Sequence, residues 1–482
     1  MKKSYKTGYI TVYLSLTVGI LLSFLFTLIE GARMKTIQFQ IECVTDIGLN
    51  SIFAEYNREM LEQYDLLFID SSYGLSNPTP DRTKSHLIQY MNLNFNPPGK
   101  NAIEQYKDLT ALNADNARLD KISFASDDCG KVMEYQIQQL IKDTKGLSFL
   151  TNSGKSYEEY KQRESEYETY RANRSQNKEV INGIIDEINA NREEDEDPVG
   201  IDNPADAVEE LSTGSVLNYA IKDVNSISRN TCNLSEYISH RASNKGCGLD
   251  SSQQVSDSVL SKDLYTKYIL DKCGYFNNKK ENAKINYQIE YLLKGKDSDV
   301  SNLELVAEQI FKIRYAINMA YLFSDSGKQM EAEELALAVT SAIMKPQLCE
   351  AVKISILFAW GYAESAKDLR ILFDGHKLPD IKNDSTWNTP LSQMVTFKSH
   401  LGEYHTSADG KSYKDYIHLF LMLNDKNTTN IRLMDIMEMD IRKTMGNRHF
   451  QMDYCIYQLR AEINVSSKYG YGYQINRFYS YE

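Results

Sequence analysis

One uninterrupted apolar stretch limits what this chain can fold into more than any other feature. From Tyr9 to Ile29 the sequence contains no charged residue. As a helix at about 1.5 Å per residue, this run would measure roughly 31 Å, which is enough to cross the hydrocarbon core of a membrane. A cleaved signal peptide would have a shorter apolar region of about 7–15 residues and a small-residue cleavage site, and neither fits well here. We therefore expect an uncleaved signal anchor within residues 1–35.

Positive charges before this stretch predict its orientation. Lys2, Lys3 and Lys6 precede it, and loops rich in lysine and arginine stay on the cytoplasmic side. Arg33 and Lys35 follow the stretch and weaken this bias. The expected arrangement is a cell-membrane protein with a cytoplasmic N-terminus and the bulk of the chain outside the cell.

A row of small residues runs along the same stretch. Glycine, serine and threonine recur at every fourth position, which lets a second membrane helix approach closely with a right-handed crossing. The alternative is chance recurrence, because these residues are common in membrane helices. We interpret the row as a helix-packing surface whose partner could be a second copy of the chain. Its members are Thr11, Ser15, Gly19, Ser23, Thr27 and Gly31.

The helix is expected to continue beyond the membrane. Residues 33–58 contain no proline, and apolar residues recur there at helical spacing. This pattern predicts one face that packs against the rest of the protein. The residues of that face are Ile37, Ile41, Val44, Gly48, Ile52 and Tyr56.

The N-terminal region also has a distinctive order of motifs. Gly8 follows a short basic leader, Glu30-Gly31-Ala32-Arg33 closes the apolar stretch, and Asp46 comes about a dozen residues later. This order resembles the signature of TadE/TadG-type minor pilins of tight-adherence (Flp-type) pilus systems. Those pilins usually carry Glu five residues after the processing glycine, where this chain has Tyr13. The resemblance implies a pilus context, but cleavage after Gly8 and pilus entry through that Glu do not follow from it. The motif positions are Gly8, Glu30, Gly31, Arg33 and Asp46.

Segments spread along the rest of the chain resemble a second family. They are similar to parts of an uncharacterised, membrane-anchored bacterial family catalogued as domain of unknown function 5702, which is associated with secretion or pilus loci. The resemblance implies a location and a context but no reaction. The segments are Glu62–Asp70, Leu211–Asn218, Tyr287–Tyr291 and Asp415–Leu419.

The search for chemistry excludes several classes of function. A formal net charge of −12 argues against nucleic acid as a partner. There is no His-Glu-x-x-His motif and no Gly-x-Ser-x-Gly elbow, and Gly154-Lys155-Ser156 lacks the first glycine of a phosphate-binding loop. The acidic run after Arg192 matches no calcium loop of defined geometry. We expect no enzymatic activity, no cofactor and no metal.

The cysteines give no site either. There are 7 of them and no Cys-x-x-Cys pair, so an odd thiol remains unless it pairs between chains. If the region lies outside the cell, Cys232, Cys247 and Cys273 are the most plausible disulfide partners. Our expectation is that the cysteines are buried and reduced.

Most of the chain is predicted to be helical. Asn101–Ala114 and Lys131–Lys145 read as helices, and Lys121–Asp128 reads as a strand. The charged run Tyr157–Arg192 predicts a long solvated helix that packs only at its C-terminal end. Leu348–Leu372 is apolar but interrupted by charges, which predicts a buried core helix and no second membrane span. Further core helices are expected at Asp263–Lys272, Asn302–Phe323, Glu331–Met344 and Ile431–Lys443.

Strand patterns lie towards the two ends of the chain. Asp65–Asp70 is a short apolar run before a turn, and Cys455–Val465 with Tyr471–Tyr479 partly alternate as a β-hairpin does. An isolated hairpin is marginal in water, so we expect one shared sheet, with Leu66–Ile69 close to Ile475–Tyr479. Pilins lay a small sheet on the projecting part of an N-terminal helix, and this chain is expected to have a similar frame.

The predicted fold class is therefore α+β and predominantly helical. It comprises a long N-terminal transmembrane helix, a small antiparallel sheet and a large helical insertion. The expected segments are 1–35 (leader and anchor), 36–80 (membrane-proximal helix and strand), 81–192 (charged helices), 193–204 (acidic linker), 205–447 (helical core) and 448–482 (hairpin).

Two functions from different classes remain. The first is a single-pass structural or assembly component of a tight-adherence pilus or related secretion system. Its partners would be the membrane and other pilus or secretion subunits, including a second copy. The alternative is an extracellular module that binds cell-wall or carbohydrate ligands through the Tyr-rich C-terminal sheet.

Overall fold

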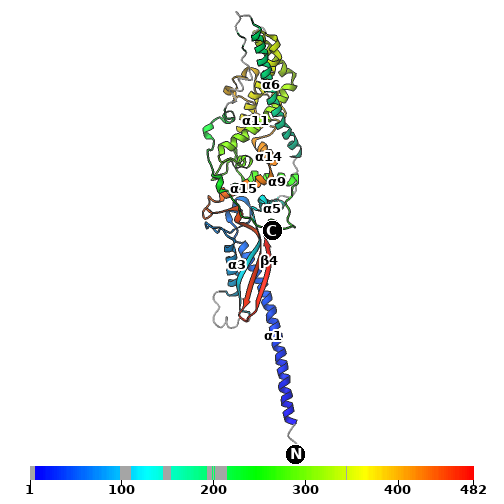
Figure 1. Ribbon diagram of the computed structural model, residues 1–482, viewed down its shortest axis with the longest axis vertical. Coiled ribbons are helices and arrows are strands. Elements are labelled where there is room, and N and C mark those ends of the chain that lie inside the picture. The colour runs from blue at the N-terminus through cyan, green and yellow to red at the C-terminus, as the bar shows by residue number, and fades with distance from the viewer. Residues whose placement is uncertain are drawn as a thin grey trace, which may run out of the picture. The chain divides into compact units, whose positions relative to one another are not determined.

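The computed structural model describes residues 6–97, 110–144, 153–192, 198, 200, 214–342 and 345–481 (Figure 1). Within these residues the chain is mostly helical and has one four-stranded antiparallel sheet, which confirms the predicted α+β class. The chain divides into two compact units. Unit 1 contains Met1–Gln136, Ala242–Gln254 and Ile441–Glu482, and unit 2 contains Ile137–Arg241 and Val255–Asp440.

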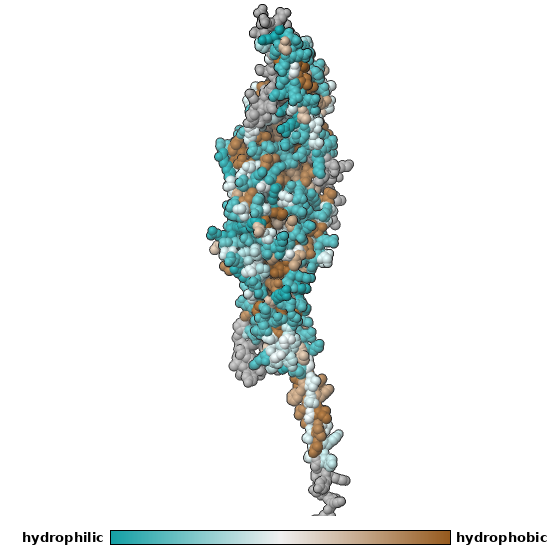
Figure 2. Space-filling model, in the orientation of Figure 1, coloured by the Kyte–Doolittle hydropathy of each residue, from teal (hydrophilic) through white to brown (hydrophobic). Residues whose placement is uncertain are grey.

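The long N-terminal helix α1 (Lys6–Phe53) joins the predicted anchor to its continuation without a break. It is the one helix of the described ranges that is long and apolar enough to cross a membrane. Figure 2 shows hydrophobic side chains along its exposed first half. Its second half buries Ile37, Ile41, Val44 and Ile52, which confirms most of the predicted apolar face. The last predicted position, Tyr56, lies beyond the end of α1 and forms a β-bridge with Ile69.

The sheet of unit 1 is built around the strand β3 (Cys455–Ser467). Its Ile463 pairs with Ala117 of β2 (Leu112–Phe124) and with Ile475 of β4 (Gly472–Ser480), so β3 lies between these two strands. Every pair is antiparallel, and β3 is buried along most of its length. The predicted hairpin is confirmed.

The short strand β1 (Ile69–Asp70) shares this sheet, as predicted, but in a different register. It pairs with Ile456 and Cys455 of β3. The expected register against Ile475–Tyr479 is wrong. The reason is that β4 covers β3 only as far as Gln458, which leaves the start of β3 open for β1.

Strand β2 is the largest error of the sequence prediction in unit 1. The strand begins at Leu112 and ends at Phe124, whereas the sequence predicted a strand only from Lys121 and a helix through Ala114. Residues 101–109 of that predicted helix lie outside the described residues. Because β2 is long and paired along most of β3, the partner strand decides its conformation.

The core of unit 1 lies between the second half of α1, the helix α3 (Pro80–Phe95) and the sheet. Gly48 of α1 packs tightly against α3, since a Cβ there would lie 3.0 Å from Met91 Cγ and 3.1 Å from Leu87 Cδ1. Unit 1 also contains α2 (Arg58–Tyr64) and the start of α5 (Asp127–Thr144), which is regular only after Gly130 and continues into unit 2.

Unit 2 is helical in its described residues. The apolar α13 is buried over most of its length, which confirms the prediction of a core helix. The helices are α6 (Ser153–Ala190), α8 (Leu217–Ala220), α9 (Val259–Lys272), α10 (Gln288–Lys294), α11 (Asp299–Ser324), α12 (Ser326–Ala342), α13 (Cys349–Phe373), α14 (Tyr413–Leu423) and α15 (Lys426–Ile441). Short 3-10 turns occur in unit 2 at Val224–Ser226, Leu234–Glu236, Pro346–Leu348, Asp384–Thr386, Leu391–Gln393 and Phe397–His400, and in unit 1 at Met452–Tyr454.

Helix α6 packs more extensively than its charge predicted. Tyr167 meets Tyr315 of α11 at 5.7 Å between ring centroids, and Tyr170 stacks on Phe323 at 5.9 Å. The expectation of packing only at the C-terminal end is therefore wrong, because the interleaved tyrosines supply apolar surface on a charged helix. The acidic linker 193–204 lies outside the described residues except for positions 198 and 200, and the segment boundaries remain predictions.

Candidate functional site

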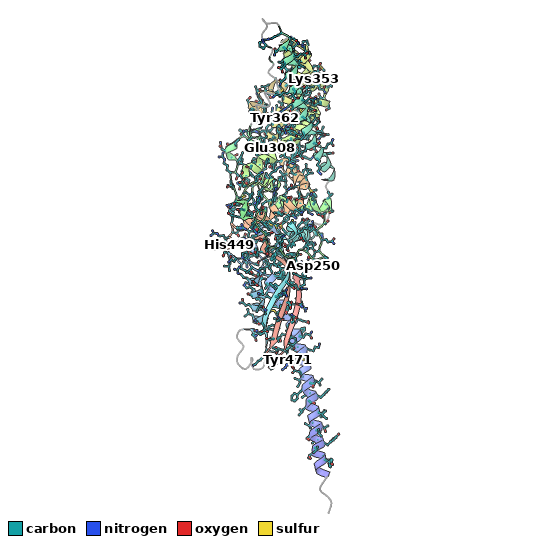
Figure 3. The ribbon with its side chains drawn as sticks, viewed as in Figure 1. Asp250, Glu308, Lys353, Tyr362, His449 and Tyr471 are labelled. Carbon is teal, nitrogen blue, oxygen red and sulfur yellow. The ribbon has the colours of Figure 1, made fainter. Side chains whose placement is uncertain are left out.

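The C-terminal hairpin contacts α1 where its apolar stretch ends. Arg33 Nη2 lies 2.7 Å from Glu30 Oε1, and the Tyr471 hydroxyl donates a hydrogen bond of 2.8 Å to the same oxygen. The Arg33 guanidinium also lies over the Tyr469 ring, 4.2 Å from its centroid. Figure 3 shows Tyr471 beside α1 at the end of the hairpin. We call Glu30, Arg33, Tyr469 and Tyr471 the junction cluster.

Local geometry explains how each side chain reaches the cluster. Glu30 and Arg33 are three residues apart on a helix, so their side chains face each other. The two tyrosines come from the turn between β3 and β4, where Gly470 has φ +85°. Side-chain-bearing residues rarely adopt that conformation, so a glycine allows the tight reversal. The Gly470 amide closes the turn by donating to the Ser467 carbonyl at 2.9 Å.

The charges of the junction cluster compensate one another. The hydrogen bond to Glu30 raises the pKa of Tyr471, so this phenol remains a proton donor at neutral pH. The Glu30 carboxylate is paired with Arg33, whose guanidinium also gains a cation–π contact. The cluster therefore carries little net charge at the end of the apolar stretch.

Strand β4 continues along the second half of α1. Arg477 Nε lies 3.4 Å from Asp46 Oδ1, and the Tyr481 hydroxyl donates to the Phe53 carbonyl at 2.7 Å. The Phe53 ring packs on Tyr479 and Tyr481 at centroid distances of 4.7 and 4.9 Å. The tyrosines of the hairpin thus hold it to the helix.

The structure brings together only some of the motif positions identified from the sequence. Glu30, Arg33 and Asp46 all contact the hairpin. Gly31 is exposed, and a Cβ added there would meet nothing within 4 Å. Gly8 lies in the first turns of α1. The assignment of these positions as a pilin-like motif remains a prediction.

The row of small residues on α1 is solvent-exposed in this chain, and the hydroxyls of Ser15, Ser23 and Thr27 bond to backbone carbonyls of the same helix. Ser15 donates to the Val12 carbonyl at 2.9 Å, and Thr27 donates to the Ser23 carbonyl at 2.8 Å. A Cβ added at Gly19 would meet nothing within 4 Å. These hydroxyls therefore need no hydrogen-bond partner from another helix. The role of the row in helix packing remains a prediction.

Unit 2 contains a buried network of charges that the sequence did not predict as a group. Asp368 accepts from Arg314 Nε at 2.9 Å and from Lys382 Nζ at 2.7 Å, and Lys382 also pairs with Glu364. Burial would raise the pKa of Asp368, but the two cations hold it below its usual value. All four side chains are fully buried. The network is neutral and internally paired, as expected of a structural element.

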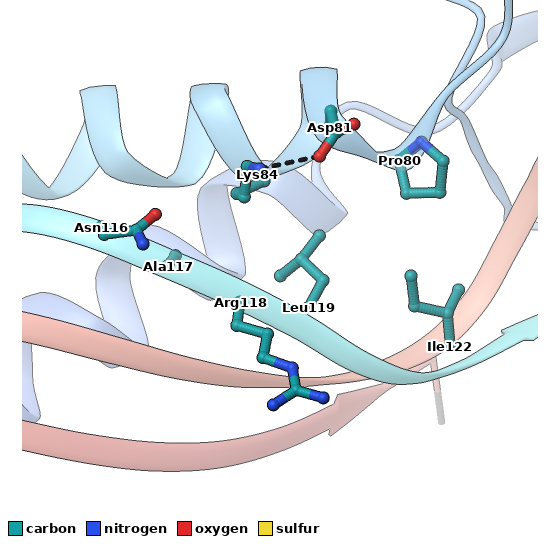
Figure 4. Close-up of a pocket in the computed structure, with 8 residues that line it drawn as sticks. All are labelled: Pro80, Asp81, Lys84, Asn116, Ala117, Arg118, Leu119 and Ile122. Atoms are coloured by element: carbon teal, nitrogen blue, oxygen red, sulfur yellow. Dashed lines mark hydrogen bonds and ion pairs between the residues drawn. The ribbon is translucent and has the colours of Figure 1, made fainter.

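Each unit has a surface hollow among its described residues. A pocket of about 340 Å³ lies between the start of α3 and β2 (Figure 4). Lys84 Nζ pairs with Asp81 Oδ1 there at 2.7 Å, and the Arg118 side chain points away from α3. Hydrogen bonding to Lys84 lowers the pKa of Asp81, so the pair stays ionised. This pocket is lined by Pro80, Asp81, Lys84, Asn116, Ala117, Arg118, Leu119 and Ile122.

The second hollow lies in unit 2 and has a volume of about 390 Å³. Aromatic and basic side chains dominate its lining, and the Tyr315 hydroxyl is buried without a hydrogen-bond partner. The lining residues are Tyr167, Arg171, Arg174, Gly214, Val216, Glu308, Phe311, Lys312, Tyr315 and Tyr362.

All cysteines are free thiols in the structure. Burial raises the pKa of Cys232 to about 11 and that of Cys273 to about 12, so both are protonated at neutral pH. Cys247 and Cys129 are exposed, contrary to the expectation that the cysteines are buried. Across the described ranges, no three His, Cys, Asp or Glu side chains come together as metal ligands.

These features define a class of protein. A candidate membrane helix continues into a small unit that contains the sheet, and the sequence of this unit is interrupted by the helical unit 2. The chain belongs to the family of unknown function DUF5702, whose family model matches residues 193–467, more than half of the chain. The matched region contains most of unit 2 and β3 but not α1. No curated protein and no solved structure matches the chain.

Proposed function

We propose that this protein is a single-pass bacterial cell-surface protein that acts as a structural or assembly component of a tight-adherence (Flp-type) pilus or a related secretion system. The observation that carries the proposal is the division of α1. Its first half exposes an apolar surface to its surroundings, and its second half packs against a small sheet. This arrangement resembles a pilin frame, and Glu30, Arg33 and Asp46 of the TadE-like motif contact the C-terminal hairpin.

The orientation of the proposal follows from the lysines that precede the apolar stretch. With Lys2, Lys3 and Lys6 in the cytoplasm, the exposed thiol of Cys247 would lie outside the cell. A membrane-impermeant thiol reagent should then label Cys247 in intact cells. Labelling of Cys247 only after cell lysis would reverse the orientation.

Assembly through the small-residue row can be tested at its centre. Gly19→Ile places a branched side chain on the row and should weaken association of α1 with a partner helix by about 1 kcal/mol. Leu21→Ile changes a neighbouring position off the row and should have little effect. The measurement is co-purification of membrane partners after crosslinking in cells. Equal recovery with both variants would contradict packing through this row.

The alternative function, an extracellular binding module, finds its best support in unit 2. Tyr479 of β4 and Tyr481, which follows the strand, pack on Phe53, and this leaves less aromatic surface for a sugar on the hairpin. The hollow of unit 2 instead offers aromatic rings beside Arg174 and Lys312, which suits an acidic carbohydrate. Binding of a uronic-acid oligosaccharide that is lost in Lys312→Glu would favour this alternative.

A further inference from the structure

We propose that the turn between β3 and β4 is a lipid-contacting surface that rests on the phospholipid headgroups of the membrane crossed by α1. The proposal rests on the proposed anchoring by α1 and extends it. It gives unit 1 a second contact with the membrane and names the chemistry of that contact.

The sequence of α1 indicates the position along the helix at which the membrane surface lies. Tyr9 to Ile29 carries no charge, and Glu30 is the first charged residue after it. Carboxylates and guanidinium groups are costly in hydrocarbon and are tolerated in the headgroup layer. Arg33 follows less than one helical turn later, about 4.5 Å further along the axis. Glu30 and Arg33 are therefore expected in the headgroup layer, next to the hydrocarbon boundary.

The junction cluster holds the turn at this same height. Tyr471 is hydrogen-bonded to Glu30 at 2.8 Å, and Tyr469 lies under the Arg33 guanidinium at 4.2 Å. These contacts join the turn to the two residues that mark the boundary. The turn cannot rise away from the membrane surface without breaking them.

The exposed side chains of the turn have the chemistry of a headgroup contact. Tyr469 is 43% exposed although its ring also contacts Arg33, and Lys468 beside it is exposed. Tyrosine is enriched at membrane interfaces because its ring is apolar and its hydroxyl is wet. A lysine ammonium is attracted to lipid phosphates. Since Arg33 already neutralises Glu30, that carboxylate does not oppose the attraction.

A second contact would limit how unit 1 moves at the membrane. A single helix leaves a protein free to tilt about the point where it leaves the bilayer. A turn fixed beside the helix adds a second point of support on the same surface. The sheet and the second half of α1 would then keep a defined angle to the membrane.

Tryptophan fluorescence tests the proposal in the full-length protein reconstituted into vesicles of phosphatidylcholine and phosphatidylglycerol. Tyr469→Trp places a probe in the turn, and Phe478→Trp is the matched control. Both native side chains are aromatic and 43% exposed, but Phe478 lies about 20 Å further along β4. The signal of the 2 native tryptophans, measured in the unmodified protein, is subtracted.

Lipids that carry a spin label on the headgroup should quench Tyr469→Trp at least twofold more strongly than Phe478→Trp. Lys468→Trp should behave like Tyr469→Trp, and it leaves the ring contact with Arg33 intact. Equal quenching of the turn and control positions would overturn the proposal.

A separate probe distinguishes failure of this proposal from failure of anchoring. Leu21→Trp should be quenched by lipids labelled deep in the acyl chains if α1 crosses the bilayer. If Leu21→Trp is quenched and neither turn position is, the lipid contact is wrong and the anchor stands. If Leu21→Trp is not quenched, the anchor fails and the lipid contact fails with it.

Discussion

Glu290 shows how one buried carboxyl can make the stability of unit 2 depend on pH. Its side chain is fully buried, accepts a hydrogen bond of 2.6 Å from Tyr413 and another of 2.9 Å from the Phe276 amide. Its second oxygen is buried without a partner. Burial is the largest effect and raises the pKa of Glu290 to about 7, although both donors act in the opposite direction. Near neutral pH the folded chain therefore holds a proton that the unfolded chain has lost.

Replacing Glu290 with Gln should flatten this pH dependence. An acid whose pKa is raised by folding stabilises the protein fully below its unfolded value of 4.5, and this contribution is lost as the pH rises towards 7. Gln keeps an oxygen for Tyr413 and Phe276 and carries no charge. From pH 5 to pH 8, the natural protein should lose on the order of 2 kcal/mol relative to Glu290→Gln. Chemical unfolding of the full-length protein in detergent measures this, and parallel pH profiles would contradict it.

At the scale of single elements, the packing of α1 on α3 depends on a missing side chain. Gly48 brings the two helices together at Met91 and Leu87. The same helix elsewhere carries glycines for which an added Cβ would meet nothing, as at Gly19 and Gly31. Only Gly48 is therefore required by close packing among these three.

Gly48→Val should destabilise unit 1 by about 1–3 kcal/mol, because the added methyl groups must displace Met91 and Leu87 from a packed core. Gly48→Ala would be a poor test, because alanine has a higher helix propensity than glycine and would offset the cost of packing by up to about 1 kcal/mol. Gly183→Val is the matched control, because a Cβ at this exposed position of α6 meets nothing within 4 Å. The midpoints of chemical unfolding should differ between the two variants. A control as unstable as Gly48→Val would point to helix propensity as the cause.

At the scale of the whole molecule, unit 1 depends on residues that are remote in the sequence. β3 lies between β2 and β4 and also pairs with β1, so every described strand of the sheet needs it. Ile456, Leu459 and Ile463 of β3 are completely buried. Burying three such side chains is worth about 5–9 kcal/mol, which is comparable with the whole stability of a typical domain.

Deleting Cys455–Glu482 should therefore unfold the sheet of unit 1 and leave α3 without the surface that it covers. Limited proteolysis of the full-length and truncated proteins in detergent should show rapid cleavage within residues 58–97 and 110–124 only after truncation. The helices of unit 2 pack on one another and serve as the internal reference. Unchanged protection of residues 58–97 and 110–124 would contradict a dependence on β3.

Elements whose signal lies within a short window of the sequence are predicted correctly. The anchor stretch, the apolar face of α1 and the alternation in the hairpin are visible within short windows, and the structure has these elements. Strand β2 was missed because its core positions include Ala114 and Ala117, which carry little β-propensity. The contact of Tyr471 with Glu30 joins residues 441 positions apart, and no local pattern indicates it.

Because every described strand of the sheet pairs with β3, the sheet cannot form until β3 has been synthesised. Gln458 of β3 donates to Ser123 of β2 across 335 residues of chain. At about 5–20 residues per second, a ribosome needs roughly 20–70 s to supply that partner. During this interval α1 and β2 have left the ribosome while the surface that should cover them has not been made. A chain whose synthesis stops before β3 would keep these apolar residues exposed. Quality-control proteases would then degrade it before it assembles with complete molecules.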